Sequence, residues 1–263
     1  MIDLHGHYLP GVDDGAGNME ESLAMLRLAE ADGIAAVAVT PHACSSLCKA
    51  KDFDSLRRSW SEWRAALENE PLRLRIVPGA EVYFTSELLP LLRDHRDLLT
   101  INNGSYFLLE FPADYVYAHS KEFIFKILTD GFIPIISHAE RNQEIQRSPV
   151  VLRELVKAGA LCQVNAGSLR GDFGNAARRC AYELLRDNLV HVIASDAHDL
   201  GKRRPGLAFV RALLQGVEAE KIDLYLEGIP AAVIADEAIP DIGEPVSRQP
   251  RRTFFDFLRK RDS

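Results

Sequence analysis

Short apolar or β-branched runs alternate with longer segments of helical periodicity along most of the chain. The short runs are rich in Val, Ile and Ala and are bounded by turn residues, which predicts buried strands. The candidate strands are residues 2–7, 34–40, 74–82, 105–111, 132–138, 160–165 and 190–196. Helical segments separate them.

The first two helical segments carry clear boundary and packing signals. Asn18, followed three residues later by Glu21, predicts a helix start, and Gly33 predicts the end of that helix. In the second segment, residues 53–67, apolar side chains recur every three or four positions, which predicts one face against the core. These side chains are Phe53, Leu56, Trp60, Trp63 and Leu67.

Strand, helix and strand repeat without a break in composition. This order predicts parallel strands joined by right-handed crossovers. Seven such units favour one closed or distorted α/β barrel over two domains. We therefore predict a single barrel domain over residues 1–240. A basic, amphipathic tail over residues 241–263 would follow, beginning with a linker that contains Pro and Gly.

The composition is that of a soluble enzyme, with 47% hydrophobic and 26% charged residues. No apolar run approaches the roughly 18 residues of a membrane span, and the amino end lacks the basic region of a signal peptide. These features predict a cytoplasmic protein. The four cysteines form no CxxC pair, which argues against a disulfide scaffold or a zinc ribbon.

The net charge of −7 gives no general attraction for nucleic acid, so local cations would have to hold an anionic substrate. The tail differs, because residues 248–263 contain six Lys or Arg and two Asp, a net charge of +4. Four apolar side chains among these basic residues are typical of an amphipathic helix for an acidic membrane or a partner. They are Phe254, Phe255, Phe257 and Leu258. A docked last helix or a frayed end is the alternative.

Side chains that can bind metal ions gather at the carboxyl ends of the predicted strands. Eight of them are His5, His7, His42, Glu81, Glu110, His138, Asp196 and His198, and Asp14 on the first loop can reach the same face. Since the carboxyl ends of parallel strands share one face of a barrel, we expect all nine to converge. Imidazole and carboxylate without thiolate suit zinc, iron or manganese, and nine ligands imply several ions.

A cluster of divalent ions at the mouth of a barrel indicates phosphoester hydrolysis. The ions would lower the pKa of a bridging water and neutralise charge on a phosphoryl group. Cationic side chains would still be needed for the non-bridging phosphate oxygens. Arg141, and Arg203 with its neighbour Arg204, follow the predicted ligands closely enough to serve.

Two further patterns are expected to carry no chemistry. His95, His119 and His191 lie away from the strand ends, so we expect them to bind no metal. Cys180 and Arg186 match the Cys-x5-Arg spacing of cysteine-dependent tyrosine phosphatases. That chemistry needs a loop of backbone N–H groups around the phosphate, whereas the intervening residues here are helix formers without glycine.

The ordered motifs of the chain resemble those of a known family. The motifs are MIDLHGH at 1–7, PGVDDG at 10–15, TPH at 40–42, PGAE at 78–81, HAER at 138–141, QVNAGS at 163–168 and SDAH at 195–198. They are similar to the polymerase and histidinol phosphatase (PHP) superfamily. Within it they resemble the CpsB/CapC-like metal-dependent protein-tyrosine phosphatases of bacterial capsule and exopolysaccharide clusters. The likeness extends to about residue 236.

The resemblance implies a distorted (β/α)7, TIM-barrel-like fold with a trinuclear site at the carboxyl ends of the strands. The nine ligands would divide among three ions. His5, His7 and Asp196 would bind the first ion, Glu110 and His138 would bind the second, and Glu81 would bridge the first and second ions. Asp14, His42 and His198 would bind the third ion. Asp14 and Glu110, where other branches use histidine, resemble the tyrosine-phosphatase branch. Manganese is usually associated with that branch, and iron, zinc and cobalt are alternatives.

The resemblance also implies an activity and a partner. A metal-bridging hydroxide would attack phosphorus in line, while Arg141 and Arg203 steady the phosphate, with Arg204 as the alternative to Arg203. The substrate would be a tyrosine-phosphorylated protein, the autophosphorylating tyrosine kinase of a polysaccharide export system. Residues 43–50 depart from the family pattern, because they lack a second histidine and aromatic residues, and this departure bears on substrate recognition.

Two other functions are compatible with the same residues. The first keeps the barrel and its ions but acts on a small phosphate ester, or on a phosphodiester as a nuclease does, although the acidic body disfavours nucleic acid. The second is a non-catalytic, metal-stabilised regulatory module. That function usually accompanies lost ligands, and none of the nine is lost here.

Overall fold

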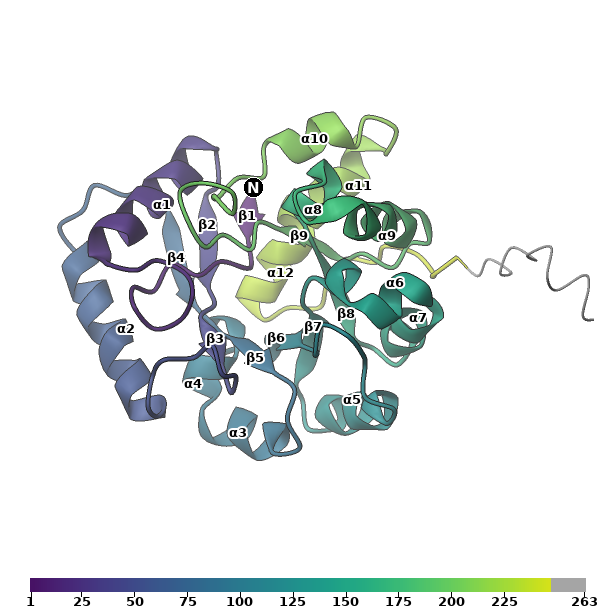
Figure 1. Cartoon of the computed structure of the whole chain (residues 1–263), viewed down its shortest axis with the longest axis horizontal. Helices are drawn as coiled ribbons and strands as arrows, with labels where there is room; N and C mark the ends of the chain where they lie inside the picture. Colours follow the sequence, from purple (N-terminus) through teal and green to yellow (C-terminus); the bar gives the residue numbers. More distant parts are fainter. Residues whose placement is uncertain (247–263) are drawn as a thin grey trace, which may run out of the picture.

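The computed structural model describes residues 1–246, which form a parallel barrel surrounded by helices (Figure 1). The strands are β1 (Ile2–Asp3), β2 (Ala36–Val39), β3 (His42–Ala43), β4 (Arg75–Pro78), β5 (Glu81–Tyr83), β6 (Tyr106–Glu110), β7 (Ile133–Ile136), β8 (Leu161–Asn165) and β9 (Val192–Ala194). The predicted distorted α/β barrel is confirmed. Of the basic tail predicted over residues 241–263, residues 247–263 lie outside the described residues.

Most helices lie around the outside of the barrel, whereas α12 lies across its middle in the view of Figure 1. The helices are α1 (Met19–Ala31), α2 (Phe53–Leu67), α3 (Leu88–Asp94), α4 (Arg96–Leu99), α5 (Ser120–Thr129), α6 (Gln143–Arg147), α7 (Val150–Lys157), α8 (Ala166–Arg170), α9 (Gly174–Arg186), α10 (Phe209–Leu213), α11 (Ala219–Asp223) and α12 (Ile229–Ala235). Short turns of 3-10 helix, η1 (Ile101–Asn103) and η2 (Ala139–Arg141), and a π-helical turn, η3 (Leu224–Gly228), complete the order. No helix within residues 1–246 is long and apolar enough to span a membrane.

Two prolines mark breaks between short strands. β3 follows β2 after Pro41, beyond the predicted strand 34–40, and the strand predicted over 74–82 splits into β4 and β5 after Pro78. Proline has no amide hydrogen to donate, so each ladder breaks there. The break lets the chain change partners, because β4 pairs with β2, whereas β5 pairs with β3 and β6. The uninterrupted strand predicted over 74–82 is therefore wrong in this detail, whereas β2 lies within the strand predicted over 34–40.

The first and last strands close the barrel. Asp196 N donates to His5 O at 2.9 Å, and His7 N donates to Ala197 O at 2.8 Å. Just before these bonds, the buried Asp3 carboxylate accepts from Ser195 N at 2.9 Å and from Ser195 Oγ at 2.5 Å. The closing contacts therefore lie within the two segments that carry four of the predicted metal ligands.

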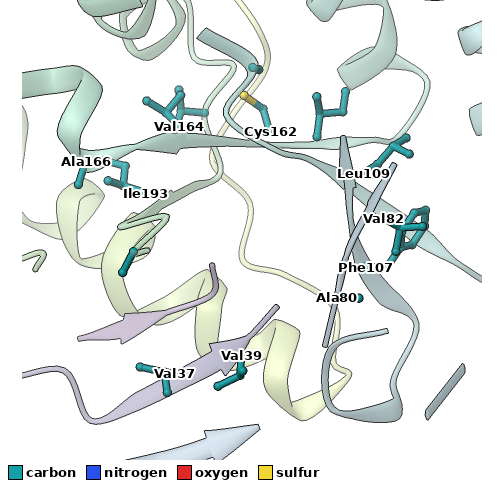
Figure 2. Packing of buried hydrophobic residues seen from close by; sticks show 14 of the residues in the cluster. Val37, Val39, Ala80, Val82, Phe107, Leu109, Cys162, Val164, Ala166 and Ile193 are labelled. Atoms are coloured by element: carbon teal, nitrogen blue, oxygen red, sulfur yellow. The ribbon is translucent and has the colours of Figure 1, made fainter. Parts of the chain in front are cut away.

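Alternate strand residues form an outer and an inner core, as expected for two-residue periodicity. Val37, Val39 and Phe107 belong to the outer cluster between strands and helices, part of which Figure 2 shows. Their neighbours Ala38 and Leu108 belong to the inner cluster. Ile229, Val233 and Ile234 of α12 join this inner cluster with residues near the strand starts, so α12 seals the amino end of the barrel.

The two helices predicted in detail are confirmed. Asn18 caps α1 by accepting from Glu21 N at 2.9 Å, although the Glu21 carboxylate accepts from Gly17 N rather than from Asn18 N. Gly33, with a φ of +84°, follows the helix in the left-handed region. In α2, Leu56, Trp60 and Trp63 are buried in the outer core.

The chain stays attached to the barrel beyond residue 240. Asn188 Nδ2 donates to the carbonyls of Ile242 and Gly243 at 2.9 and 2.7 Å, and Val246 N donates to Asp187 O at 2.9 Å. These bonds hold the last described residues against the carboxyl end of α9. The boundary at residue 240 stays a prediction.

Candidate metal centre

All nine predicted ligands meet at the carboxyl ends of the strands, opposite α12. His42 begins β3, Glu81 begins β5 and Glu110 ends β6, and the other six lie in loops at that end of the barrel. Within residues 1–246, three groups have ligand atoms close enough to share an ion. They are His5 with His7 and Glu81, His42 with Glu81 and Glu110, and His7 with Asp14, His42 and His198.

The first group, extended by Asp196, has the dimensions of a four-ligand metal site. His5 Nε2 lies 3.3 Å from His7 Nε2, 3.3 Å from Glu81 Oε2 and 3.5 Å from Asp196 Oδ1. His7 Nε2 lies 3.6 Å from each of these two carboxylate oxygens. Bonds of about 2.1 Å to one ion would separate its ligands by about 3.0 to 3.4 Å. The spacing of these four atoms therefore suits a shared cation.

The second and third groups are joined to the first through Glu81 and His42. Glu81 Oε1 lies 2.7 Å from His138 Nε2, while its other oxygen faces the first group. His42 Nδ1 lies 3.2 Å from Glu81 Oε2 and 3.6 Å from Glu110 Oε2. The opposite ring nitrogen of His42 lies 3.4 Å from Asp14 Oδ1, which is also 3.4 Å from His198 Nε2.

Several atoms of the cluster are buried and lack a hydrogen-bond partner among the described residues. They include His42 Nδ1, His198 Nε2 and Asp196 Oδ1. Leaving such atoms unpaired is costly, and a cation would satisfy them. Burial and the nearby charge of Glu81 raise the pKa of Glu110 to about 7, as expected for carboxylates crowded together without a counter-ion. The residues therefore fit divalent metal ions.

A set of buried hydrogen bonds orients the ligand side chains. Asp13 Oδ2 lies 2.7 Å from His7 Nδ1 and accepts from His42 N at 3.0 Å, so it fixes two ligands at once. Gln163 Oε1 lies 3.1 Å from His5 Nδ1. Such contacts set which imidazole nitrogen faces the ion. Although burial opposes its ionisation, the hydrogen bond and charge of His7 lower the pKa of Asp13 below its usual value.

The same network reaches Asp196 from the other side. Gln163 Nε2 donates to Asn165 Oδ1 at 2.7 Å, and Asn165 Nδ2 donates to Asp196 Oδ2 at 2.7 Å. Sequence reasoning assigned no role to Asp13, Gln163 or Asn165. Asp13 could have been found as the carboxylate beside Asp14, but nothing in the sequence says which imidazole it faces.

Two ligands have left-handed backbone conformations. The φ angles of His138 and Asp196 are +31° and +54°. Such conformations are uncommon for residues other than glycine and tend to occur at functional sites. In both cases the residue lies just after a strand, where the turn directs its side chain back over the mouth of the barrel.

Two of the three predicted phosphate-binding arginines lie at the cluster. Arg141 Nη1 and Arg203 Nη2 donate to Asp196 Oδ2 at 2.8 and 2.7 Å. Both guanidinium groups also lie over the Phe173 ring, at 4.5 and 5.9 Å from its centroid, a contact that sequence reasoning missed. Arg204 instead is exposed and borders a separate hollow with Arg170. The structure therefore favours Arg203 over Arg204.

The three histidines expected to be non-ligands lie outside the cluster. His95 stacks on Phe53 with ring centroids 3.8 Å apart, and the side chain of His119 is 92% exposed. His191 is buried, its Nδ1 accepts from Cys162 N at 3.2 Å, and burial lowers its pKa to about 4. It is a neutral core histidine.

Comparison with known proteins identifies the family. A family model described as "Capsular polysaccharide synthesis, CpsB/CapC" matches residues 1–224. The chain belongs to the CpsB/CapC family. It is 37% identical over 203 residues to tyrosine-protein phosphatase YwqE of Bacillus subtilis, covering 77% of this chain and 79% of that protein. It is 31% identical over 248 residues to tyrosine-protein phosphatase CpsB of Streptococcus pneumoniae, covering 91% and 100%.

Solved structures agree with this assignment to the CpsB/CapC family. A chain described under "Crystal structures of YwqE from Bacillus subtilis and CpsB from Streptococcus pneumoniae, unique metal-dependent tyrosine phosphatases" has a TM-score of 0.85 at 32% identity, covering 94% of this chain and 100% of that chain. An organophosphorus hydrolase of Deinococcus radiodurans has a TM-score of 0.52 at 14% identity, covering 89% and 92%. The second likeness shows the barrel fold alone.

The structure also places two segments singled out in the sequence. Cys180 is buried within α9, and burial raises its pKa to about 12, so the Cys-x5-Arg match carries no nucleophile. Segment 43–50 folds onto the loop that bears Asp13. Lys49 N donates to Val12 O at 2.7 Å, and Lys49 Nζ donates to Asp13 O.

Replacing Asp13 by Asn tests the orienting network. Asp13→Asn removes one carboxylate oxygen from beside His7 and His42, and loss of such a contact typically weakens metal binding by about 10- to 100-fold. Calorimetric titration of chelator-stripped protein with Mn²⁺ measures the effect. Asp54→Asn, at an exposed position of α2, is the matched control. Equal Mn²⁺ affinity in the two variants would contradict the proposed role of Asp13.

Proposed function

We propose that this CpsB/CapC chain is a metal-dependent protein-tyrosine phosphatase. The observation that carries the proposal is a cluster of nine imidazole and carboxylate side chains beside two arginines at the mouth of the barrel. Its relatives YwqE and CpsB are named tyrosine-protein phosphatases, and the matching solved chain is described as metal-dependent.

We assign three divalent metal ions to the cluster, and manganese is the metal that we propose. His5, His7 and Asp196 would hold one ion and share Glu81 with a second. The remaining ligands are Glu110 and His138 on the second ion and Asp14, His42 and His198 on the third. Ions held there would lower the pKa of bound water and neutralise charge on the phosphoryl group. Asp13 and Gln163 would keep the histidine rings oriented toward the ions.

The arginines would bind the substrate phosphate. Arg141 and Arg203 share one oxygen of Asp196, and the other Asp196 oxygen faces the imidazoles. Their remaining N–H groups can donate to the non-bridging oxygens of a phosphoryl group placed over the ions. Phe173 limits the movement of both guanidinium groups, so less side-chain entropy is lost when phosphate binds.

The partner we propose is a tyrosine-phosphorylated protein, a tyrosine autokinase that controls capsular or exopolysaccharide synthesis. The family description, capsular polysaccharide synthesis, supports that setting. Phosphotyrosine on a protein must reach a site at the surface of its phosphatase. The cluster meets this need, because Asp14 is 40% exposed and Arg141 is 32% exposed at its edge.

Turnover of three substrates tests the proposed function. Manganese-loaded protein should hydrolyse a phosphotyrosine peptide in preference to a phosphoserine peptide and histidinol phosphate.

The double variant His5→Ala/His7→Ala should fall to the rate of chelator-stripped protein, whereas Cys180→Ala should stay near the wild-type rate. Equal rates on the three substrates would leave a hydrolase without the tyrosine specificity, and an inactive Cys180→Ala would refute the metal-based chemistry.

Neutralising Arg203 tests the phosphate-binding role. Charge-assisted hydrogen bonds contribute about 1.5–3 kcal/mol, so Arg203→Gln should lower kcat/KM for phosphotyrosine peptide by about 10- to 100-fold. Arg204→Gln, one residue along the chain, should keep the wild-type value. Because Arg203 also contacts Asp196, bound metal is counted in each variant. A loss of activity matched by a loss of metal would show that Arg203 supports Asp196 and does not bind phosphate.

A further inference from the structure

A buried carboxylate without an assigned role lies between a proposed metal ligand and a proposed phosphate-binding arginine. Glu140 belongs to the turn η2, two residues after His138 and directly before Arg141. Sequence reasoning assigned functions to the first and last residues of the HAER motif at 138–141, but none to Glu140. The residue is fully buried, so any part it plays in the site is exerted through its neighbours.

The Glu140 carboxylate holds η2 against the start of α8. Its Oε1 accepts from Asn165 N at 3.1 Å and from Ser168 Oγ at 2.5 Å. The Glu140 carbonyl accepts from Gln146 Nε2 at 2.8 Å, which ties the same turn to α6. The residue directly before Arg141 is therefore attached to two helices at once.

These contacts close a ring that includes Arg141 itself. Asn165, whose backbone bonds to Glu140, donates from Nδ2 to Asp196 Oδ2 at 2.7 Å. The same Asp196 oxygen accepts from Arg141 Nη1 at 2.8 Å. Glu140 thus anchors the backbone next to Arg141, Asp196 holds its guanidinium group, and Asn165 connects these two anchors.

A carboxylate is an unfavourable side chain for this position if packing is its only task. Burial of a carboxylate costs free energy unless its oxygens are bonded, and Glu140 Oε2 has no hydrogen-bond partner within residues 1–246. An apolar side chain of similar volume would avoid this cost. The bonds of Oε1, however, have a direction that apolar packing lacks, and they fix the placement of η2 relative to α8.

We propose that Glu140 is a positioning residue that sets where Arg141 meets the substrate phosphate. The proposal rests on the phosphatase function above. Arg141 has a long, partly exposed side chain, and its backbone position decides which phosphate oxygens its guanidinium group can reach. By holding that backbone against α8, Glu140 keeps the N–H groups that Asp196 leaves free directed at the phosphoryl group.

His138 has anchors of its own, so a shift at residue 140 leaves the metal ligands in place. Ser137 N donates to Leu109 O at 3.0 Å, and His138 N donates to Gln163 Oε1 at 2.8 Å. These bonds hold the chain before it reaches Glu140. Loss of the Glu140 carboxylate therefore affects phosphate binding more than metal binding.

Three variants separate the positioning role from a general loss of stability. Glu140→Ala removes both bonds of Oε1, whereas Glu140→Gln keeps an acceptor oxygen at nearly the same volume. Leu152→Ala removes a fully buried apolar side chain from α7, outside the ring of contacts, and lowers stability alone.

Calorimetric titration of manganese-loaded protein with inorganic phosphate measures the effect without turnover. Glu140→Ala should bind phosphate at least about tenfold more weakly than wild-type protein at unchanged manganese content. Glu140→Gln and Leu152→Ala should stay near the wild-type affinity. Wild-type phosphate affinity in Glu140→Ala, a parallel loss of manganese, or an equal loss of affinity in Leu152→Ala would overturn the positioning role.

A double-mutant cycle tests whether Glu140 acts through Arg141. Arg141→Gln alone should weaken phosphate binding, and adding Glu140→Ala should have little further effect, because the group that Glu140 positions is already gone. Additive losses would overturn the assignment to Arg141. If phosphate binding follows these predictions but wild-type protein does not turn over a phosphotyrosine peptide, the phosphatase function is refuted and the positioning of a bound anion stands.

Discussion

The pairing of the first strand with the last is the constraint on which the metal centre depends. His5 and His7 stand near the amino terminus, and Asp196 and His198 stand almost two hundred residues later. Two backbone hydrogen bonds and the Asp3–Ser195 contacts align these segments. Because side chains two residues apart on an extended chain share a face, this register directs His5 and His7 together over the mouth of the barrel. The left-handed turn at Asp196 brings Asp196 and His198 beside them.

The two carboxylate oxygens of Asp196 have different partners, and this links the proposed ions to the proposed substrate site. One oxygen accepts from Arg141, Arg203 and Asn165, and the other faces three imidazoles at 3.4 to 3.6 Å. The guanidinium groups are thus held beside the cluster by a carboxylate that also belongs to it. Phosphate can bind to arginines already in place, which is the advantage of preorganised electrostatics.

Much of the barrel and of the ligand set could be predicted from the sequence, for one physical reason. Ligands at the carboxyl ends of parallel strands must converge, so spacing relative to the strands was enough to bring Glu81, His138 and Asp196 together. Strand continuity was less predictable. Pro41 and Pro78 were visible, but whether a proline ends a strand or only breaks its ladder depends on which neighbour the chain pairs with next.

The supporting contacts could not be predicted because they join residues distant in sequence through side-chain geometry. Gln163 contacts a ligand from the first strand, and Phe173 lies under arginines from two different loops. The choice between Arg203 and Arg204 likewise depends on the direction of one short turn. The contact of Glu140 with the start of α8 arises from packing between two turns, which no local pattern encodes.

The most direct test of the account is the metal affinity of Asp3→Ala. The substitution leaves the buried Ser195 N without its acceptor, at about 1–3 kcal/mol, and leaves Ser195 Oγ only the longer contact to His5 O at 3.4 Å. It therefore loosens the closure while every ligand remains. Leu152→Ala, on the buried face of α7 and away from the cluster, gives a comparable loss of stability. Calorimetric titration with Mn²⁺ should show at least about tenfold weaker binding for Asp3→Ala and wild-type binding for Leu152→Ala. Wild-type binding by Asp3→Ala, or equal weakening in both, would contradict the claim that strand closure assembles the metal centre.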